Sequence, residues 1–191
     1  LKKADKTFKK ESYVSAIQIY ERLANKGMGS EQIYEKLGDA NYFNAHYVQA
    51  QKWYEKRYAL SGIFPKEFLY RYGQSLKSSG KDKQGQEILA QYAKENPTQI
   101  RAKNQSRQLV QKRNKKGSDL FTIQNITTNS KYSDYSSTLK GDTLIFASAR
   151  PQSLGNQLYA RTGQPYTNLY YAVKQADGNY SKAELYSKNT F

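Results

Sequence analysis

A ten-residue pattern returns 34 positions later in this chain. Residues 12–21 read SYVSAIQIYE and residues 46–55 read HYVQAQKWYE, so Tyr, Val, Ala, Tyr and Glu recur at the same offsets. A fixed period of this length with Ala-x3-aromatic inside it is typical of helix–turn–helix units, which bury their apolar faces by stacking on one another. The period therefore predicts an α-solenoid, a kind of domain that usually presents a concave surface to another protein.

The pattern marks three successive units. Repeat one ends near Met28, and its second helix carries apolar residues at i, i+4 and i+7 from Ala16. The pattern residues of the other two units are Tyr34, Leu37, Gly38, Ala50 and Tyr54 in repeat two, and Leu69, Tyr72, Gly73, Leu76, Gly85 and Leu89 in repeat three. Pro97 is expected to end the last of these helices, because a proline cannot continue a helix.

Residues 1–97 therefore resemble tetratricopeptide repeats. The resemblance implies that the small residues Ala16, Ala50 and Gly85 lie at tight crossings between neighbouring helices. The alternative is a generic helical bundle whose spacing coincides by chance.

The charge of the chain changes near Gly117. Residues 1–118 hold 24 Lys and Arg against 11 Asp and Glu, whereas residues 119–191 hold 7 against 5. Residues 98–116 are predicted to form one further helix with seven basic residues and no acid. This helix is either the polar cap that a solenoid needs or a docking strip for an anionic partner. Its candidate strip residues are Arg101, Lys103, Arg107, Lys112 and Arg113.

After residue 117 the pattern predicts short strands in place of helices. Strands are expected at residues 121–123, at residues 144–146 as a fully buried strand, and at residues 169–173. Turn sequences separate them, and residues 176–179 predict a hairpin that joins Tyr171 to Tyr180. The predicted fold class is α+β with two domains: a tetratricopeptide-repeat α-solenoid over residues 1–117 and an all-β segment over residues 118–191.

The β segment resembles the first blade of a WD40-like (PD40) propeller in residues 133–135, 140–150 and 168–172. Repeats followed by such a blade are similar to the front of OmpA-family envelope proteins of Bacteroidetes. The resemblance implies a scaffold in the periplasm, associated with the outer membrane and with type IX secretion or gliding motility. It also implies a protein partner, for example an outer-membrane barrel, and peptidoglycan binding through a domain absent from this chain.

One departure from that family concerns the propeller. A propeller needs at least four blades of four strands, and the 73 residues after Ser118 can form little more than one blade. We therefore expect either an incomplete propeller in a fragment or strands that pair with something else. Because no signal peptide precedes Leu1, we also expect a processed or trimmed chain.

Composition narrows the possible chemistry. The chain has no Cys and one His, His46, so thiol nucleophiles and disulfides are excluded, and only carboxylates and His46 could form a metal site. No apolar run approaches the roughly 20 residues of a membrane span. We expect no cofactor and no metal. The 18 Tyr and 7 Phe argue against global disorder.

Several residues that could carry chemistry have simpler interpretations. His46 is expected to be exposed in a turn between helices, and Trp53 to be a packing residue. Ser78-x2-Lys81 has the spacing of a penicillin-binding motif but lacks its supporting motifs. Asp134 and Asp142 are placed in turns, where Asp bonds to nearby N–H groups. A glycan hydrolase that uses these two acids as a pair is a hypothesis, but we expect no enzyme.

The positive hypothesis concerns the concave face. The tetratricopeptide resemblance implies that the first helix of each unit lines it, which gives the candidate partner-binding residues Asp39, Tyr42, Phe43, Tyr70, Gln74 and Lys77, with Asp5, Lys9, Gln32 and Glu35 beside them. The predicted function is a non-catalytic envelope scaffold that binds a protein partner. The alternative is a nucleic-acid or anionic-surface binding protein, suggested by the pI of about 9.7. We expect no nucleic-acid partner, because no RNA- or DNA-reading motif is present.

Overall fold

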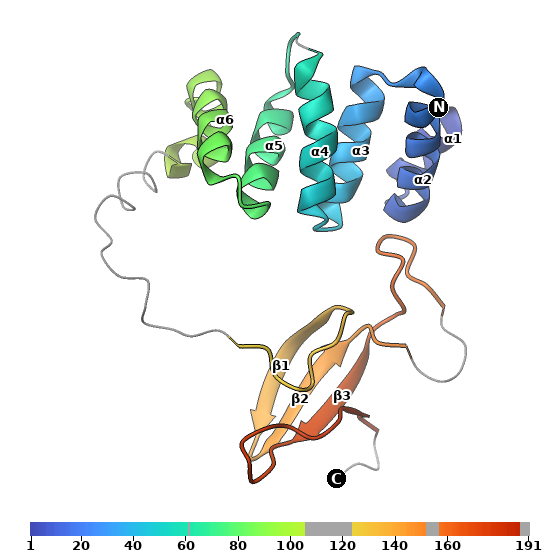
Figure 1. The fold of residues 1–191 in the computed structure, drawn as a ribbon, viewed down its shortest axis with the longest axis vertical. Coiled ribbons are helices and arrows are strands. Elements are labelled where there is room, and N and C mark those ends of the chain that lie inside the picture. The colour runs from blue at the N-terminus through green and yellow to red at the C-terminus, as the bar shows by residue number, and fades with distance from the viewer. Residues whose placement is uncertain (61, 106–123, 152–156, 188–191) are drawn as a thin grey trace. The chain divides into compact units, whose positions relative to one another are not determined.

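The computed structural model describes residues 1–60, 62–105, 124–151 and 157–187. The chain divides into two compact units, Leu1–Ser118 and Asp119–Phe191, which are called the helical unit and the β unit below (Figure 1).

The helical unit consists of helix pairs that stand side by side in chain order (Figure 1). The elements are α1 (Lys2–Lys9), α2 (Tyr13–Leu23), the π-helical turn η1 (Ala24–Met28), α3 (Glu31–Phe43), α4 (Tyr47–Ala59), α5 (Lys66–Ser78) and α6 (Asp82–Glu95). Helix α6 stops two residues before Pro97, and residues 100–105 are helical again. The predicted order of paired helices is confirmed.

The two helices of each pair cross where one of them has almost no side chain. A Cβ atom on Gly38 would overlap the ring of Tyr54, and one on Gly73 would lie 2.6 Å from Cγ of Leu89. In α6, a Cβ on Gly85 would lie 2.9 Å from the carbonyl oxygen of Gly73. Ala16 and Ala50 are completely buried. The tight crossing expected at Gly85 is therefore present, and Ala16 and Ala50 are buried between helices.

The core of the helical unit consists of two apolar clusters. One cluster joins α1, α2 and α3, and its buried residues are Ala4, Ala16, Tyr20, Ile33 and Leu37. The other runs from α4 to the helical segment after Pro97, and its buried residues are Ala50, Tyr54, Phe68, Leu69, Tyr72, Leu76, Tyr92 and Ala102. Because Ala102 is only 3% exposed, residues 100–105 pack against this cluster, as the predicted cap would. The rest of the predicted helix over 98–116 lies outside the described residues from position 106 onward.

The β unit contains one antiparallel sheet in the order β1-β2-β3-β4. Its strands are β1 (Asp134–Lys140), β2 (Thr143–Ser148), β3 (Asn168–Val173) and β4 (Glu184–Leu185). Gly141 takes a left-handed φ of +58° in the turn between β1 and β2, where glycine carries no steric penalty. The predicted hairpin after β3 forms, because Lys174 pairs with Tyr180 and Gln175 N–H donates to the carbonyl of Asn179 at 2.7 Å.

Two predictions for the β unit are wrong, and one is untested. Residues 144–146 were expected to be fully buried, but only Phe146 is, since Leu144 and Ile145 are half-buried. Phe146 shares a covered face with Tyr170, whereas Ile145 alternates to the other face. Asp134 was expected in a turn but opens β1. The strand predicted at residues 121–123 lies outside the described residues.

Gly38→Ala tests the crossing. In an ordinary helix interior this change stabilises by roughly 0.5–1 kcal/mol. Here the new methyl group overlaps Tyr54, so we expect the free energy of unfolding to fall by about 1–3 kcal/mol. Chemical denaturation followed by circular dichroism measures this. Ser15→Ala, at an exposed position of α2, is the control for helix propensity and should not destabilise. A Gly38→Ala protein as stable as the wild type would contradict the close crossing.

Candidate functional site

The first helices of the repeats lie on the inner side of the helical unit. Several Cα atoms of α3 lie within 8 Å of Cα atoms of α5, whereas the backbones of α4 and α6, which are both fully described, do not approach each other to the same extent. Elements of a curved solenoid crowd together on its concave side. The surface formed by α1, α3 and α5, called the first-helix surface below, is therefore the concave one.

A repeating cation–aromatic contact links successive units along this surface. The Nζ atom of Lys36 lies 4.5 Å from the ring centre of Phe8. The guanidinium carbon of Arg71 lies 4.8 Å from the ring centre of Phe43, and that of Arg101 lies 4.8 Å from the ring centre of Tyr70. Each cation comes from one unit and covers a ring of the unit before it. Such contacts contribute about 0.5–1 kcal/mol each where they are partly exposed.

Asp39 belongs under this surface and not on it. Its side chain is almost fully buried, and Oδ1 accepts hydrogen bonds from the Tyr54 hydroxyl at 2.8 Å and from Nη1 of Arg71 at 2.8 Å. A residue that binds a partner must expose its side chain, so the prediction that Asp39 is a partner-binding residue is wrong. The carboxylate instead joins α3, α4 and α5. Burial, followed by the charge and hydrogen bond of Asp39, raises the pKa of Tyr54 well above its usual value.

The same bond occurs in repeat one, where the Tyr20 hydroxyl donates to Asp5 at 2.6 Å. Asp5 follows Ala4 as Asp39 follows Gly38, and in both units the tyrosine comes 15 residues after the aspartate. In repeat three, Gln74 stands at the aspartate position and Leu89 at the tyrosine position. Both partners are replaced together, so no buried carboxylate is left without its donor.

The other five candidates reach the surface. Tyr42, Phe43, Tyr70, Gln74 and Lys77 are all half-buried. The ring of Phe43 stacks on Tyr13 with centroids 5.4 Å apart, and the ring of Tyr70 packs against Tyr92 at 5.3 Å. Burial, then the charge that Tyr70 would carry when ionised, raises the pKa of Tyr42. Phe43 thus both packs and remains accessible.

Sequence reasoning missed the charged residues between these rings. Glu67 forms ion pairs with Arg71 at 3.8 Å and with Arg101 at 2.8 Å. A signal was available, because Lys36 and Arg71 each stand two residues before the glycine of their helix. Of the candidate basic strip, Arg101 and Lys103 are exposed on the described cap, and the other three residues, Arg107, Lys112 and Arg113, lie outside the described residues.

The other residues of the helical unit that were considered from the sequence lie at helix ends or pack against neighbouring side chains. His46 is exposed and precedes the first residue of α4, and Trp53 stacks on Tyr34 with centroids 6.0 Å apart. Ser78 ends α5, and Nζ of Lys81 lies 3.9 Å from a carboxylate oxygen of Glu55.

Over the described ranges, no group of three or more His, Asp or Glu side chains could hold a metal ion. Within the same ranges no helix has the length and apolar character to cross a membrane.

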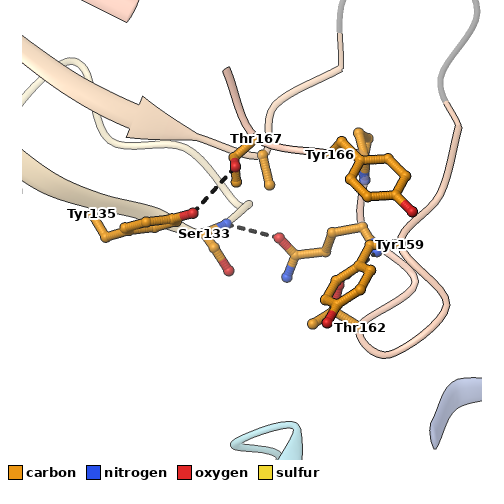
Figure 2. A pocket seen from close by; sticks show the side chains of 9 residues that line it. Ser133, Tyr135, Tyr159, Thr162, Tyr166 and Thr167 are labelled. Carbon is orange, nitrogen blue, oxygen red and sulfur yellow. Dashed lines mark hydrogen bonds between the residues drawn. The ribbon is translucent and has the colours of Figure 1, made fainter. Parts of the chain in front are cut away.

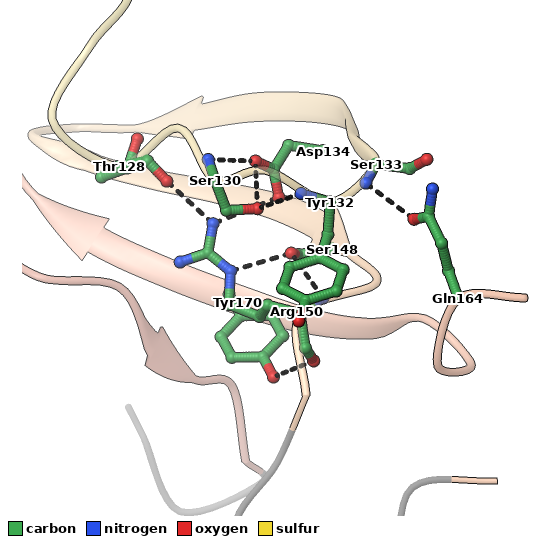
Figure 3. Close-up of polar contacts among 9 residues, drawn as sticks. All are labelled: Thr128, Ser130, Tyr132, Ser133, Asp134, Ser148, Arg150, Gln164 and Tyr170. Carbon is green, nitrogen blue, oxygen red and sulfur yellow. Dashed lines mark hydrogen bonds and ion pairs between the residues drawn. The ribbon is translucent and has the colours of Figure 1, made fainter. Parts of the chain in front are cut away.

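Arg150 is the centre of a polar cluster in the β unit (Figure 3). Its guanidinium donates to the carbonyl of Thr128 at 2.8 Å, to Asp134 at 3.1 Å and to the hydroxyl of Ser148 at 2.8 Å. The same group lies 5.0 Å from the ring centre of Tyr170. These bonds fasten the segment before β1 to the sheet.

Asp134 is held as a carboxylate in this cluster. Burial raises its pKa, but hydrogen bonds from Ser148, from the N–H and hydroxyl of Ser130, and from Arg150 outweigh this and lower the pKa overall. Asp142 follows the other end of β1, about 20 Å away at 3.3 Å per residue. The paired carboxylates of glycosidases lie about 5–9.5 Å apart, so this separation does not fit the hypothesis of a glycan hydrolase that uses Asp134 and Asp142.

A solved structure shares the fold of the helical unit. It is the C-terminal part of a TPR repeat-containing protein from Cytophaga hutchinsonii, with a TM-score of 0.53 and 22% sequence identity. The match covers 60% of this chain and 45% of that chain, so this chain spans less than half of the solved one. No protein-family model matches the sequence, and no curated protein matches it either. The shared fold supports tetratricopeptide-type repeats.

The Tyr54–Asp39 bond predicts an effect of alkaline pH. An unfolded tyrosine ionises near pH 10, whereas folded Tyr54 keeps its proton to higher pH. Stability conferred by this group is complete below about pH 10 and is lost as the pH rises further. Tyr54→Phe should flatten that loss, and at neutral pH it should lower the free energy of unfolding by about 1.5–3 kcal/mol, because the buried carboxylate loses a donor.

Urea denaturation between neutral pH and pH 11 measures both effects. Tyr47→Phe removes a hydroxyl from a half-buried tyrosine of the same helix and serves as the control. If the wild type and Tyr54→Phe lost stability equally steeply above pH 10, the buried bond would be refuted.

Asp134 predicts an acid transition confined to the β unit. Because its folded pKa is lowered, its contribution is present above the ordinary value near 4 and is lost as the pH falls through the folded value. Asp134→Asn should remove this pH dependence and weaken the unit at neutral pH. Amide NMR signals of β2 and β3, followed from pH 7 to pH 3, report on it. Asp142→Asn is the matched control, and an equal response of both variants would rule out the special role of Asp134.

Proposed function

We propose that this protein is a non-catalytic scaffold that holds a protein partner on the first-helix surface. The observation that carries the proposal is the set of half-buried aromatic side chains on α3 and α5, each held by a cation or by another ring. Tyr42, Phe43 and Tyr70 form its centre, and Gln74 and Lys77 extend it along α5.

The composition of this surface suits a protein interface. Tyr, Phe and Arg are enriched in the cores of interfaces, and Tyr and Arg supply many of the residues that dominate binding energy. Lys77 adds a cationic group near the C-terminal end of α5.

The surface is also held in place before a partner arrives. Arg71 is fixed by Asp39 at 2.8 Å and by Glu67, and it in turn covers Phe43. Arg101 is fixed by Glu67 at 2.8 Å and covers Tyr70. Side chains that are already ordered lose less entropy on binding. This rigidity supports a recognition role more than a purely structural one.

We place this scaffold in the periplasm, associated with the outer membrane, as part of a type IX secretion or gliding complex. The support is the sequence resemblance of the repeats and the blade-like residues to OmpA-family envelope proteins of Bacteroidetes. The four-stranded antiparallel order of the β unit is compatible with a single propeller blade. The partner would be an outer-membrane barrel or another envelope protein, and peptidoglycan would be bound through a domain outside this chain.

The nucleic-acid alternative has less support. Of the candidate basic strip, Arg101 already pairs with Glu67 and covers Tyr70. A salt titration separates the two functions. Binding to phosphates loses roughly 10³–10⁵ in affinity between 50 and 200 mM salt when six to ten phosphates are contacted, whereas a partner held by aromatic side chains loses far less.

Substitutions on the first-helix surface test the proposal. In a pull-down from envelope extract, Tyr42→Ala with Tyr70→Ala should lose the partners that the wild type recovers. These rings also pack against Tyr47 and Tyr92, so Lys77→Glu, which removes no aromatic ring, is tested as well and should weaken capture.

Val48→Ala, at an exposed position of the second helix α4, is the control and should recover the same partners as the wild type. Recovery of those partners by folded double and Lys77→Glu variants would mean that the first-helix surface is not the binding surface.

A further inference from the structure

The β unit contains a pocket that the proposed scaffold function does not use. It lies where β1 begins and β3 begins, and a tight hairpin over residues 157–166 forms its outer wall. The hairpin is closed by hydrogen bonds from Tyr159 N–H to the carbonyl of Gln164 and from Gly163 N–H to the carbonyl of Tyr159, both at 2.8 Å. Gly163 has a φ of +70°, as a turn of this kind requires. The wall is therefore ordered by its own backbone.

Further bonds attach the hairpin to the sheet. The backbone N–H of Ser133 donates to Oε1 of Gln164 at 2.9 Å, and the Tyr135 hydroxyl donates to Oγ1 of Thr167 at 3.2 Å. Figure 2 shows Tyr135 on one side of the pocket and Tyr159 and Tyr166 on the other. The pocket has a volume of about 260 Å³, slightly below the roughly 300–1,000 Å³ of common ligand sites. It can hold a small cyclic group but not a folded segment.

Three tyrosine rings at the pocket are accessible. The exposed fractions are 49% for Tyr135, 42% for Tyr159 and 56% for Tyr166. The rings of Tyr159 and Tyr166 lie 5.6 Å apart and inclined to each other. Tyrosine offers an apolar face and a polar hydroxyl at the same time. Each ring can therefore pack against a flat apolar surface that is edged with polar groups.

The polar groups of the lining are numerous and neutral. None of the nine lining residues is charged. Oγ1 of Thr162 and of Thr167 each accept one hydrogen bond from the protein, so their hydroxyl protons can be donated to a ligand. Oε1 of Gln164 accepts a hydrogen bond from the N–H of Ser133, so the amide NH2 group of Gln164 can donate to a ligand. Hydroxyl groups both donate and accept, so the pocket suits a ligand that does the same.

We propose that this pocket binds one ring of a neutral saccharide. The apolar C–H face of a pyranose packs between the neighbouring rings of Tyr159 and Tyr166, and its hydroxyls exchange hydrogen bonds with Thr162, Thr167 and Gln164. An anion or a cation has no countercharge in the lining. A proline-rich peptide offers pyrrolidine rings and carbonyl acceptors but few donors, so it would leave the acceptor capacity of the hydroxyls unused.

The experiment titrates the full chain with cellotetraose, mannotetraose and a chitin tetramer, observed by amide NMR. At least one should shift the signals of residues 157–167 with a dissociation constant of about 0.1–1 mM, as expected for so small a contact. Tyr159→Ala and Tyr166→Ala should each weaken binding at least about tenfold. Tyr180→Ala, a tyrosine of the same unit that does not line the pocket, is the matched control and should bind normally.

Three results would overturn the proposal. One is no shift with any of the three saccharides up to about 10 mM, a limit well beyond ordinary affinities. Another is binding that folded Tyr159→Ala and Tyr166→Ala variants retain in full. The third is binding of a proline decapeptide with the same signals and none of the saccharides. The first-helix surface does not enter this test, so its outcome is independent of the scaffold function.

Discussion

Each repeat of the helical unit depends on a crossing in which a residue with little or no side chain faces a large one. Gly38 lies under the ring of Tyr54, and Gly73 lies under Leu89. The close approach brings the next residue of the first helix into reach of the second helix. Asp39 can meet the hydroxyl of Tyr54 at 2.8 Å for this reason. The apolar contact between Gly38 and Tyr54 thus positions the hydrogen bond between Asp39 and Tyr54, and this bond helps to fix how α3 and α4 cross.

The buried carboxylate of Asp39 then connects one repeat to the next. Arg71 reaches it from α5 at 2.8 Å, and the same guanidinium covers Phe43 on the accessible side. A buried charge is tolerated only when it is paired and hydrogen-bonded, so the position of Arg71 is tightly constrained. The consequence for function is that Phe43 and its neighbours are held by a network whose origin lies in the core.

How much of this could be predicted depends on the range of each interaction. The helix pairs, their small crossing residues and the hairpin after β3 follow from local spacing, so the sequence predicted them. The burial of Asp39 could not be read in the same way, because it depends on Arg71 from the next repeat. The half-buried state of Leu144 and Ile145 depends on which face of the sheet is covered, and a single strand does not encode that. The pocket of the β unit was missed because hairpin 157–166 is irregular, and only the fold brings Tyr159 and Tyr135 to the two sides of one pocket.

The structure also changes the meaning of the basic composition. The formal charge of +15 first suggested an anionic partner as the alternative. In the helical unit, however, several acids are held by internal bonds. Asp5 is bound by Tyr20, Asp39 by Tyr54 and Arg71, and Glu67 by Arg71 and Arg101. Cations are held in the same way, since Lys36 covers Phe8, Arg71 covers Phe43 and Arg101 covers Tyr70. Each ion pair removes one positive and one negative charge, so the excess of 24 Lys and Arg over 11 Asp and Glu in residues 1–118 remains. A basic balance of this kind is a loose indicator of the partner, and the proposal of a protein partner therefore rests on the aromatic side chains and not on the net charge.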